Sequence, residues 1–284
     1  MLRKTVQIIT AVLTNSYYKG FLNGTIYKGK SKLFCVPGFN CYSCPGALGS
    51  CPIGAFQAVV NSAQYFISFY LLGFFLIIGT LLGRFVCGWL CPFGLFQEWI
   101  YKIPLRKVHL SHRYGFLKYF KYLFLLVFVI FIPILFSNAW GVGDPAYCKY
   151  ICPVGTLEAG IPLLYTNESL RSAAGTLFNW KLGILLLVVL LSTKIYRFFC
   201  KYMCPLGAIY ALFNKISCYH IKIDKQACNK CGNCLNACKM GGIPYEDPNS
   251  PECIRCGACK KACPVNAITT GFNIPVRKAN FRRF

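Results

Sequence analysis

Eight cysteines near the C-terminus fall into two consecutive C-x2-C-x2-C-x3-C runs. The first run is Cys228, Cys231, Cys234 and Cys238, and the second is Cys253, Cys256, Cys259 and Cys263. In runs of this kind, three closely spaced thiolates bind one [4Fe-4S] cluster and the fourth cysteine binds the neighbouring cluster. The spacing therefore predicts two clusters. The predicted ligands are Cys228, Cys231, Cys234 and Cys263 for cluster 1, and Cys253, Cys256, Cys259 and Cys238 for cluster 2.

Zinc and disulfides are the alternatives for these eight residues, and both fit the spacing poorly. A four-cysteine zinc site pairs its cysteines across a longer loop, not at three x2-spaced positions. Neighbours at x2 spacing also rarely suit disulfide geometry. The segment from Tyr219 to Phe272 resembles the bacterial two-cluster ferredoxins, except that Lys239 follows Cys238 where a proline is usual. This departure leaves the predicted ligands untouched.

A Cys-Pro-x-Gly sequence occurs four times before these runs, and the copies begin at Cys51, Cys91, Cys152 and Cys204. Two copies belong to a longer repeat, Arg-Phe-x-Cys-x3-Cys-Pro-x-Gly, at residues 84–94 and 197–207. Cysteines at i and i+4 share one face of a helical turn, so each repeat offers two thiolates to one point. Proline after the last cysteine suits the first turn of a new helix. We therefore expect a third [4Fe-4S] cluster bound by Cys87, Cys91, Cys200 and Cys204, which we name the inner set.

Six further cysteines, which we name the outer cysteines, lie in two outer loops. Cys35, Cys41, Cys44 and Cys51 lie in the first loop, and Cys148 and Cys152 lie in the second. By symmetry with the inner set, a fourth cluster would be bound by Cys44, Cys51, Cys148 and Cys152. Cys35 and Cys41 would then form a disulfide or act as substitute ligands. Alternatively, the first loop binds one cluster alone and Cys148 with Cys152 forms a redox-active pair. Plain packing of buried cysteines is the structural alternative, although it leaves the repeated proline and glycine unexplained.

The composition indicates a membrane protein. The chain is 56% hydrophobic, with a mean hydropathy of +0.48, yet it carries 31 Lys and Arg against 8 Asp and Glu. The stretches from Asn61 to Gly83 and from Tyr122 to Gly143 contain no charged residue, and each is long enough to cross a bilayer as a helix. The shorter apolar runs from Thr5 to Tyr18 and from Leu182 to Thr193 are further candidates. The predicted fold is thus a membrane α-helical domain over residues 1–217, with about four transmembrane helices in two parallel pseudo-repeats.

A small α+β domain, ferredoxin-like and with two [4Fe-4S] clusters, is predicted for residues 218–272. A basic tail follows over residues 273–284. The loop between Arg84 and Lys118 holds six basic residues, whereas the loop between Ser137 and Trp180 holds two. The first loop should therefore be cytoplasmic, which puts both termini and the ferredoxin domain on that side of the cytoplasmic membrane. The excess positive charge suits anionic lipid and an acidic electron carrier; no nucleic-acid role is needed to explain it.

The whole pattern resembles the NapH/NosR-type family of membrane polyferredoxins. The resemblance rests on the sequence Arg-Phe-x-Cys-Gly-Trp-Leu-Cys-Pro-Phe-Gly at residues 84–94, on a second C-x3-C-P, and on the double ferredoxin run. It implies electron transfer between the cytoplasm or the quinol pool and an extracytoplasmic reductase, and it supports the inner set as redox ligands. The additional C-x3-C-P at Cys148 and Cys152 departs from the family pattern.

These features together predict an electron carrier or oxidoreductase subunit that conducts electrons across the membrane, not a stand-alone catalyst. The expected donor is a cytoplasmic ferredoxin- or flavodoxin-like carrier or quinol, and the expected acceptor is an extracytoplasmic redox protein. A homodimer or a partner subunit would fit. One alternative is a membrane thiol reductase whose outer cysteines cycle as a disulfide. Another is a quinol-oxidising subunit of a reductase complex.

Overall fold

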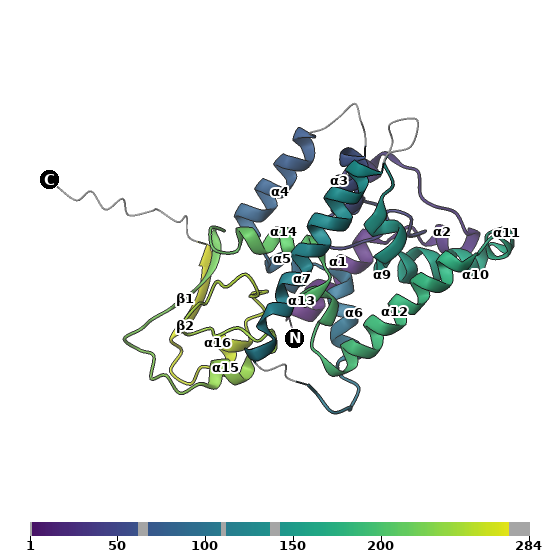
Figure 1. The fold of residues 1–284 in the computed structure, drawn as a ribbon. Helices are drawn as coiled ribbons and strands as arrows, with labels where there is room; N and C mark the ends of the chain where they lie inside the picture. The colour runs from purple at the N-terminus through teal and green to yellow at the C-terminus, as the bar shows by residue number, and fades with distance from the viewer. Residues whose placement is uncertain (1, 62–67, 109–111, 137–142, 273–284) are drawn as a thin grey trace.

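The computed structural model describes residues 2–61, 68–108, 112–136 and 143–272, which fold into a helical part and a small part with two strands beside it (Figure 1). The α-helices of the first part are α1 Leu2–Thr14, α2 Tyr18–Asn23, α3 Pro52–Val60, α4 Phe69–Leu82, α5 Phe85–Trp89, α6 Pro92–Ile100, α7 Phe120–Phe124, α8 Ile132–Leu135, α9 Pro153–Gly155, α10 Ile161–Thr166, α11 Glu168–Ser172, α12 Thr176–Lys194, α13 Phe198–Tyr202 and α14 Pro205–Phe213. Shorter 3-10 or π-helical segments are η1 Lys30–Leu33, η2 His112–Tyr119, η3 Leu125–Phe131, η4 Tyr147–Ile151 and η5 Thr156–Gly160. The predicted basic tail lies outside the described residues.

The internal repeat expected from the sequence has a counterpart in the order of the helices. α4 is followed by the five-residue α5 and the nine-residue α6, and α12 is followed by the five-residue α13 and the nine-residue α14. The chain enters the two short helices through backbone with positive φ, at Gly83 (+52°) and at Arg197 (+50°). Positive φ is uncommon for a residue other than glycine, so contacts with the rest of the protein must hold Arg197 in this conformation.

Among the residues that the structure describes, two helices are long and apolar enough to cross a membrane, Gly115–Leu135 and Thr176–Lys194. The first runs from η2 through α8 and contains a π-helical stretch. Two expected spans are shorter: α4 has 14 residues and α1 has 13, so each is only about 20 Å long at 1.5 Å per residue, less than a hydrocarbon core of about 30 Å. The expectation of four transmembrane helices is therefore supported for two of them.

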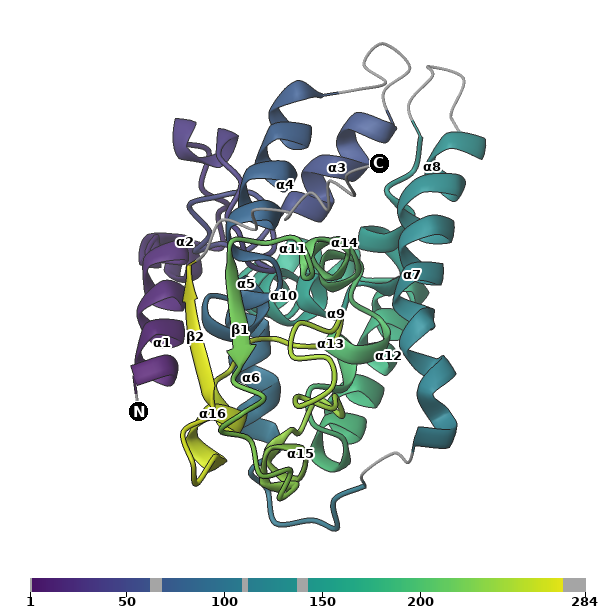
Figure 2. The same ribbon diagram turned by 90° about the vertical axis from the view of Figure 1, so that its left-hand side faces the viewer.

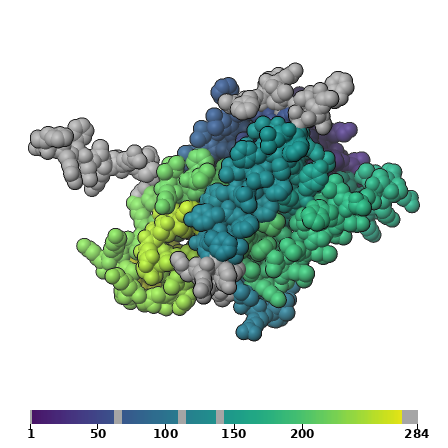
Figure 3. All heavy atoms as spheres, viewed as in Figure 1, coloured from purple at the N-terminus to yellow at the C-terminus, as the bar shows by residue number. Residues whose placement is uncertain are grey.

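The surface of these helices is rich in exposed apolar side chains. Leu186, Leu187 and Leu190 on α12 are more than half exposed, and Phe131 on η3 is 53% exposed. Figure 3 shows the Gly115–Leu135 helix lying across one face of the molecule. Exposed apolar side chains of this kind suit contact with lipid chains.

The small part is ferredoxin-like and ends the described chain. Strand β1, Tyr219–Ile223, pairs antiparallel with β2, Ile268–Phe272, and the short helices α15, Asn233–Ala237, and α16, Ala258–Ala262, contact each other. Ile221 and Ile268 from the strands pack with Cys259 in its own small core. Figure 2 shows the two strands side by side, with α16 beside their ends.

The two cysteine runs also share their backbone conformation. Lys230 and Arg255 have φ of +54° and +52°, and Gly232 and Gly257, each two residues further on, have φ of +79° and +77°. Each glycine is the N-cap of the following short helix. The same loop is therefore built twice.

The ferredoxin-like part shares its buried core with the helical part. Met240 and Ile254 belong to the same core as Phe199 and Leu206. Asn214, at the end of α14, donates hydrogen bonds to the carbonyl oxygens of Ser250 at 2.7 Å and of Cys253 at 2.9 Å. The predicted domain boundary lies between residues 217 and 218, and buried contacts join the parts on its two sides.

Candidate functional site: the cysteine centres

Each Cys-Pro-x-Gly copy begins a helix in the same way. Its cysteine is the N-cap and its proline is in the first turn, at the starts of α3, α6, α9 and α14. In two of the copies the backbone N–H of the motif glycine donates to the cysteine Sγ, from Gly155 to Cys152 at 3.4 Å and from Gly207 to Cys204 at 3.2 Å. Unsatisfied N–H groups at a helix start favour a thiolate. In these two copies the motif supplies a ligand that already accepts a hydrogen bond.

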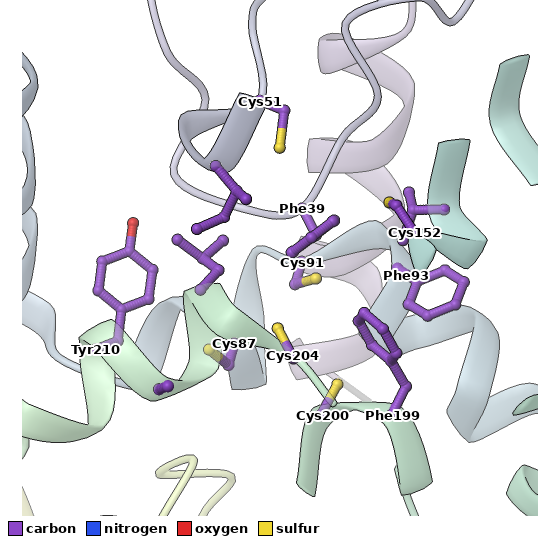
Figure 4. Packing of buried hydrophobic residues seen from close by; sticks show 14 of the residues in the cluster. Phe39, Cys51, Cys87, Cys91, Phe93, Cys152, Phe199, Cys200, Cys204 and Tyr210 are labelled. Atoms are coloured by element: carbon purple, nitrogen blue, oxygen red, sulfur yellow. The ribbon is translucent and has the colours of Figure 1, made fainter. Parts of the chain in front are cut away.

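The inner set comes together in the buried core, where all four cysteines are 6–7% exposed. Figure 4 shows the side chains of Cys87, Cys91, Cys200 and Cys204 close to one another in the core. Gln97 on α6 donates from Nε2 to the Cys200 Sγ at 3.1 Å. Hydrogen bonds of this type stabilise a negatively charged sulfur.

Two buried arginines join the repeats in a reciprocal way. Arg84, at the start of the first repeat, donates to the carbonyl oxygen of Cys200 at 3.0 Å. Arg197, at the start of the second repeat, donates to the carbonyl oxygen of Cys87. Both side chains are fully buried, so the arginines do not bind lipid headgroups. Each half therefore positions the first cysteine of the other half.

The motif glycines make room for these arginines. A Cβ at Gly94 would lie 3.1 Å from the Arg197 guanidinium, and a Cβ at Gly207 would lie 3.4 Å from that of Arg84. A larger residue would press on the guanidinium groups that hold the two halves together. The glycine of the repeat is thus explained by close approach, which a Cβ would hinder.

Each arginine has a buried carboxylate partner. Glu252, from the ferredoxin-like part, forms ion pairs with Arg84 at 3.0 Å and with Lys121 of α7. Glu98 of α6 forms ion pairs with Arg197 at 2.8 Å and with Arg3 of α1 at 2.6 Å. Buried charges are costly unless they are paired in this way.

Glu98 is buried and does not lie on an exposed polar face of α6. It is 5% exposed and also accepts a hydrogen bond from the Tyr196 hydroxyl. Burial by itself raises the pKa of Glu98, but the positive charges of Arg197 and Arg3 outweigh burial and hold the pKa at about 2. Glu98 is therefore a structural anion that ties α1, α6 and Arg197 together.

The two ferredoxin ligand sets also lie together, each with the cysteine from the opposite run. One small cavity is lined by Cys228, Cys231, Cys234 and Cys263. A second cavity of about 730 Å³ is lined by Cys238, Cys253, Cys256 and Cys259, among other residues. These are the groupings expected for cluster 1 and cluster 2.

Lys239, which replaces the usual proline, contacts the helical part. Its ammonium lies 5.5 Å from the centre of the Tyr101 ring and 5.7 Å from that of Tyr196. A cation over aromatic faces is attracted to them. The departure from the ferredoxin pattern therefore adds a contact between the two parts of the molecule.

The outer cysteines divide into those that face one another and those that do not. Cys41 Sγ lies 3.6 Å from the position that a Cβ on Gly155 would occupy, directly beside the Cys152 motif. Cys44 is buried, but its thiol points to Asn15 Oδ1 at 3.6 Å. Cys35 lies near Tyr70, whose hydroxyl accepts a hydrogen bond from the Cys35 backbone. All nineteen cysteines of the chain are free thiols in the structure.

The outer cysteines Cys51 and Cys152 belong to the same buried core as the inner set. A Cβ on Gly38, in the outer loop, would lie 3.1 Å from Cys91 Cα. The outer loop therefore reaches down to the inner set, and no gap of membrane thickness separates the two groups.

Within the described residues, no three or more His, Cys, Asp or Glu side chains lie close enough together to bind a single metal ion. A four-iron cubane holds its thiolates further apart than one ion does, because each cysteine binds a different corner. The free thiols, the N–H groups aimed at sulfur and the cysteine-lined cavities are the features that such a cluster needs.

The comparisons with known proteins agree with this chemistry. A family described as "4Fe-4S binding domain" matches residues 64–111, 122–161 and 178–223, and a second family of the same description matches residues 249–269. The chain is 25% identical to the ferredoxin-type protein NapH of Haemophilus influenzae over 173 residues, which is 58% of this chain and 50% of NapH. The chain carries 4Fe-4S binding domains and is similar to ferredoxin-type proteins such as NapH. The resemblance expected from the sequence, and [4Fe-4S] as the cofactor, are thereby confirmed.

Other relatives share between 27% and 29% identity with the chain. It is 29% identical to the regulatory protein NosR of Stutzerimonas stutzeri over 175 residues, 59% of this chain and 21% of NosR. It is 27% identical to the uncharacterized protein MJ0749 of Methanocaldococcus jannaschii over 172 residues, 58% of this chain and 55% of that protein. The chain thus spans about half the length of most of these relatives. No solved structure matches it.

Proposed function

We propose that this protein conducts electrons across the cytoplasmic membrane, from a cytoplasmic donor to an extracytoplasmic acceptor. The proposal comprises the two ferredoxin clusters, an inner cluster bound by Cys87, Cys91, Cys200 and Cys204, and an outer cysteine centre. When bound, each [4Fe-4S] cluster accepts and releases one electron. The chain contributes the spacing of these centres and their electrostatic surroundings.

The observation that carries the proposal is the continuity of the buried core. Cys238 and Cys256, expected at cluster 2, pack against the core that contains the inner set. Cys51 and Cys152 of the outer loops belong to that same core. An electron that enters the ferredoxin-like part would therefore meet successive cysteine centres without leaving the protein interior.

Buried charge supports this function at the inner set. Arg84 and Arg197 bring two positive charges close to four thiolates and are themselves balanced by Glu252 and Glu98. Positive charge and N–H donors near the sulfurs raise the reduction potential of a bound cluster. A cluster at the inner set would therefore have a raised reduction potential and would accept electrons from the clusters at the more exposed ferredoxin ligands.

The ferredoxin-like part offers a surface for the donor. Lys230, Lys260 and Lys261 are exposed near its cysteines, and basic side chains at such a site steer an acidic carrier into contact. In the proposed orientation this part faces the cytoplasm, as the basic loop between α6 and α7 also favours. A reduced ferredoxin- or flavodoxin-like protein is the donor that fits this surface.

The test is electron transfer into closed vesicles. The full chain, purified without oxygen, is inserted into liposomes that contain ferricyanide, and dithionite is added outside. We expect the wild-type protein to reduce the trapped ferricyanide, and the Cys87→Ala/Cys200→Ala variant to fall to the rate of empty vesicles. Cys218→Ala is the matched control, because Cys218 belongs to none of the proposed sets. A wild-type rate equal to that of empty vesicles would contradict the proposal.

A further inference from the structure

The geometry points to Cys41, Cys51, Cys148 and Cys152 as the ligands of a further [4Fe-4S] cluster, with Cys44 and Cys35 outside it. This inference rests on the proposed function and specifies its outer centre. It differs from the symmetric expectation in one position, where Cys41 takes the place of Cys44. It also differs from a cluster confined to the first loop, because two ligands come from the second.

Cys51 and Cys152 are the outer equivalents of Cys91 and Cys204. All four are N-caps of helices that begin with proline. The N–H of Gly155 donates to Cys152 Sγ at 3.4 Å, as that of Gly207 does to Cys204. The outer site therefore repeats the ligand geometry of the inner site at two of its four positions.

The backbone of Cys148 is hydrogen-bonded to side chains of α3 and α12. Its backbone N–H donates to Gln57 Oε1 at 3.2 Å, and Gln57 lies on α3, the helix that Cys51 begins. Its carbonyl oxygen accepts from Lys181 Nζ of α12 at 3.1 Å. Gln57 is fully buried, so this bond fixes the position of the Cys148 turn against α3.

Cys41 completes the site through the Cys152 segment. Its backbone N–H donates to Glu158 Oε2 at 2.8 Å, and Glu158 lies on η5, one turn after the Cys152 motif. Its sulfur lies over Gly155, where the absence of a side chain leaves space for it. The position equivalent to Gly155 in each inner repeat faces a buried arginine instead. The outer glycine therefore admits a thiol where the inner glycines admit a guanidinium.

Cys41 and Cys152 both lie against Gly155. The Cys41 sulfur lies 3.6 Å from the position that a Cβ on Gly155 would occupy, and the Gly155 N–H donates to Cys152 Sγ at 3.4 Å. Lys181 Nζ, which donates to the Cys148 carbonyl oxygen, lies 4.0 Å from the same position. Cys51 and Cys152 share one buried core, and Cys41 packs against it. The proposed ligands from the two loops therefore lie around one part of the core.

The Cys44 and Cys35 side chains have other partners. The Cys44 thiol is directed to Asn15 Oδ1 at 3.6 Å, at the end of α1. Cys35 forms an isolated bridge with Ser50 and lies by Tyr70. The contacts of the loop account for the positions of both residues, without a role as ligands.

The outer site adjoins the inner one. Tyr147, next to Cys148 in the chain, is fully buried in the core that also contains Cys152 and Cys204. Its hydroxyl donates to the Met203 carbonyl oxygen at 3.3 Å, one residue before Cys204. The two ligand sets therefore adjoin each other in one core.

The inference is tested by counting iron and by Mössbauer and EPR spectroscopy on full-length protein purified without oxygen. Cys41→Ala and Cys148→Ala should each lose about four irons per chain, one cluster's worth, while Cys44→Ala and Cys35→Ala keep the wild-type content. The EPR signals of the two ferredoxin clusters serve as the folding control and should persist in all four variants.

Two results would overturn the inference. Loss of a cluster in Cys44→Ala, with Cys41→Ala intact, would restore the symmetric ligand set. Retention of full iron in Cys148→Ala would confine the centre to the first loop or leave it as thiols. The iron content does not depend on electron transfer, so a protein that binds this cluster yet fails the vesicle assay would refute the proposed function and leave the ligand assignment standing.

Discussion

The ferredoxin ligands and the inner set are both groups of four cysteines, yet the chain assembles them by different means. The cluster 1 ligands come from one segment of 36 residues, Cys228 to Cys263, and Cys231 among them is exposed. The inner ligands come from two segments more than a hundred residues apart and are all buried. Local backbone shape is enough for the first group, whereas the second needs Arg84 and Arg197 to join its halves. An exposed site encoded by one loop and a buried site that depends on long-range ion pairs should respond differently to mutation.

The largest expected effect follows from breaking one of these ion pairs. Arg197→Ala leaves Glu98 with fewer partners and removes the bond to the Cys87 carbonyl oxygen. Losing one partner of a buried pair typically costs about 3–5 kcal/mol. We expect thermal unfolding of the helical part in detergent at clearly lower temperature and loss of the inner cluster, with the EPR signals of the ferredoxin clusters retained.

The exposed Arg171 provides the matched control for that experiment, because its replacement by alanine should leave both signals and the unfolding temperature unchanged. If Arg197→Ala kept the inner cluster, the arginine would not be what joins the halves.

Lowering the pH should separate the two regions in a similar way. The pKa of Glu98 is about 2 in the folded protein and 4.5 in the unfolded chain, a difference equivalent to about 3 kcal/mol. Because the folded pKa is the lower one, this stabilisation is complete above about pH 5 and is lost as the pH falls from there toward 2. Unfolding of the helical part measured from pH 7 to pH 3 should show this loss, and Glu98→Gln should flatten the profile. An equally steep profile in the variant would assign the pH dependence to other groups.

A smaller and more selective effect is expected from Gln97→Leu. This change removes the Nε2–H donor to Cys200 Sγ, and one hydrogen bond of about 1 kcal/mol corresponds to about 40 mV. The potential of the inner cluster should therefore fall by roughly that amount in a redox titration followed by EPR. The ferredoxin potentials are the internal reference, and an equal shift in all of them would show that the donor acts on the whole protein and not on the inner set.

Sequence reasoning succeeded where the determinants are local. The ferredoxin runs and the Cys-Pro-x-Gly helix starts could be predicted, because ligand spacing, proline and glycine act within one turn or loop. The role of Arg84 could not, since its partner is a carbonyl oxygen 116 residues away. Nothing in a loop rich in glycine and proline distinguishes Cys41 from Cys44. Glu98 carried one usable signal: it is one of only eight acidic residues in a strongly basic chain, and it follows a repeat that contains an arginine.

The membrane spans show the same limit. Hydropathy predicted apolar stretches from Tyr122 to Gly143 and from Leu182 to Thr193, which overlap the apolar helices Gly115–Leu135 and Thr176–Lys194. It also predicted the end of α4, because the stretch from Asn61 stops at Gly83. It did not indicate that α4 begins only at Phe69 and has 14 residues.

The smallest expected effect concerns the contact between the two regions. Lys239→Ala removes a cation from the faces of Tyr101 and Tyr196, a change worth about 0.5–1 kcal/mol at an exposed site. Limited proteolysis should show slightly faster cleavage between the helical and ferredoxin-like parts, with the iron content unchanged. Lys225→Ala, at another exposed lysine of the ferredoxin-like part, is the control. Equal cleavage rates in both variants would mean that Lys239 does not fasten the two parts.

The most direct test of the account is the iron and acid-labile sulfide content per chain of protein purified without oxygen, compared with the Cys87→Ala/Cys200→Ala variant. Four clusters predict about sixteen irons and as many sulfides in the wild type, with about four of each lost in the variant. About eight irons in both proteins would contradict the account, because the buried cysteines would then be plain thiols beside an anchored two-cluster ferredoxin.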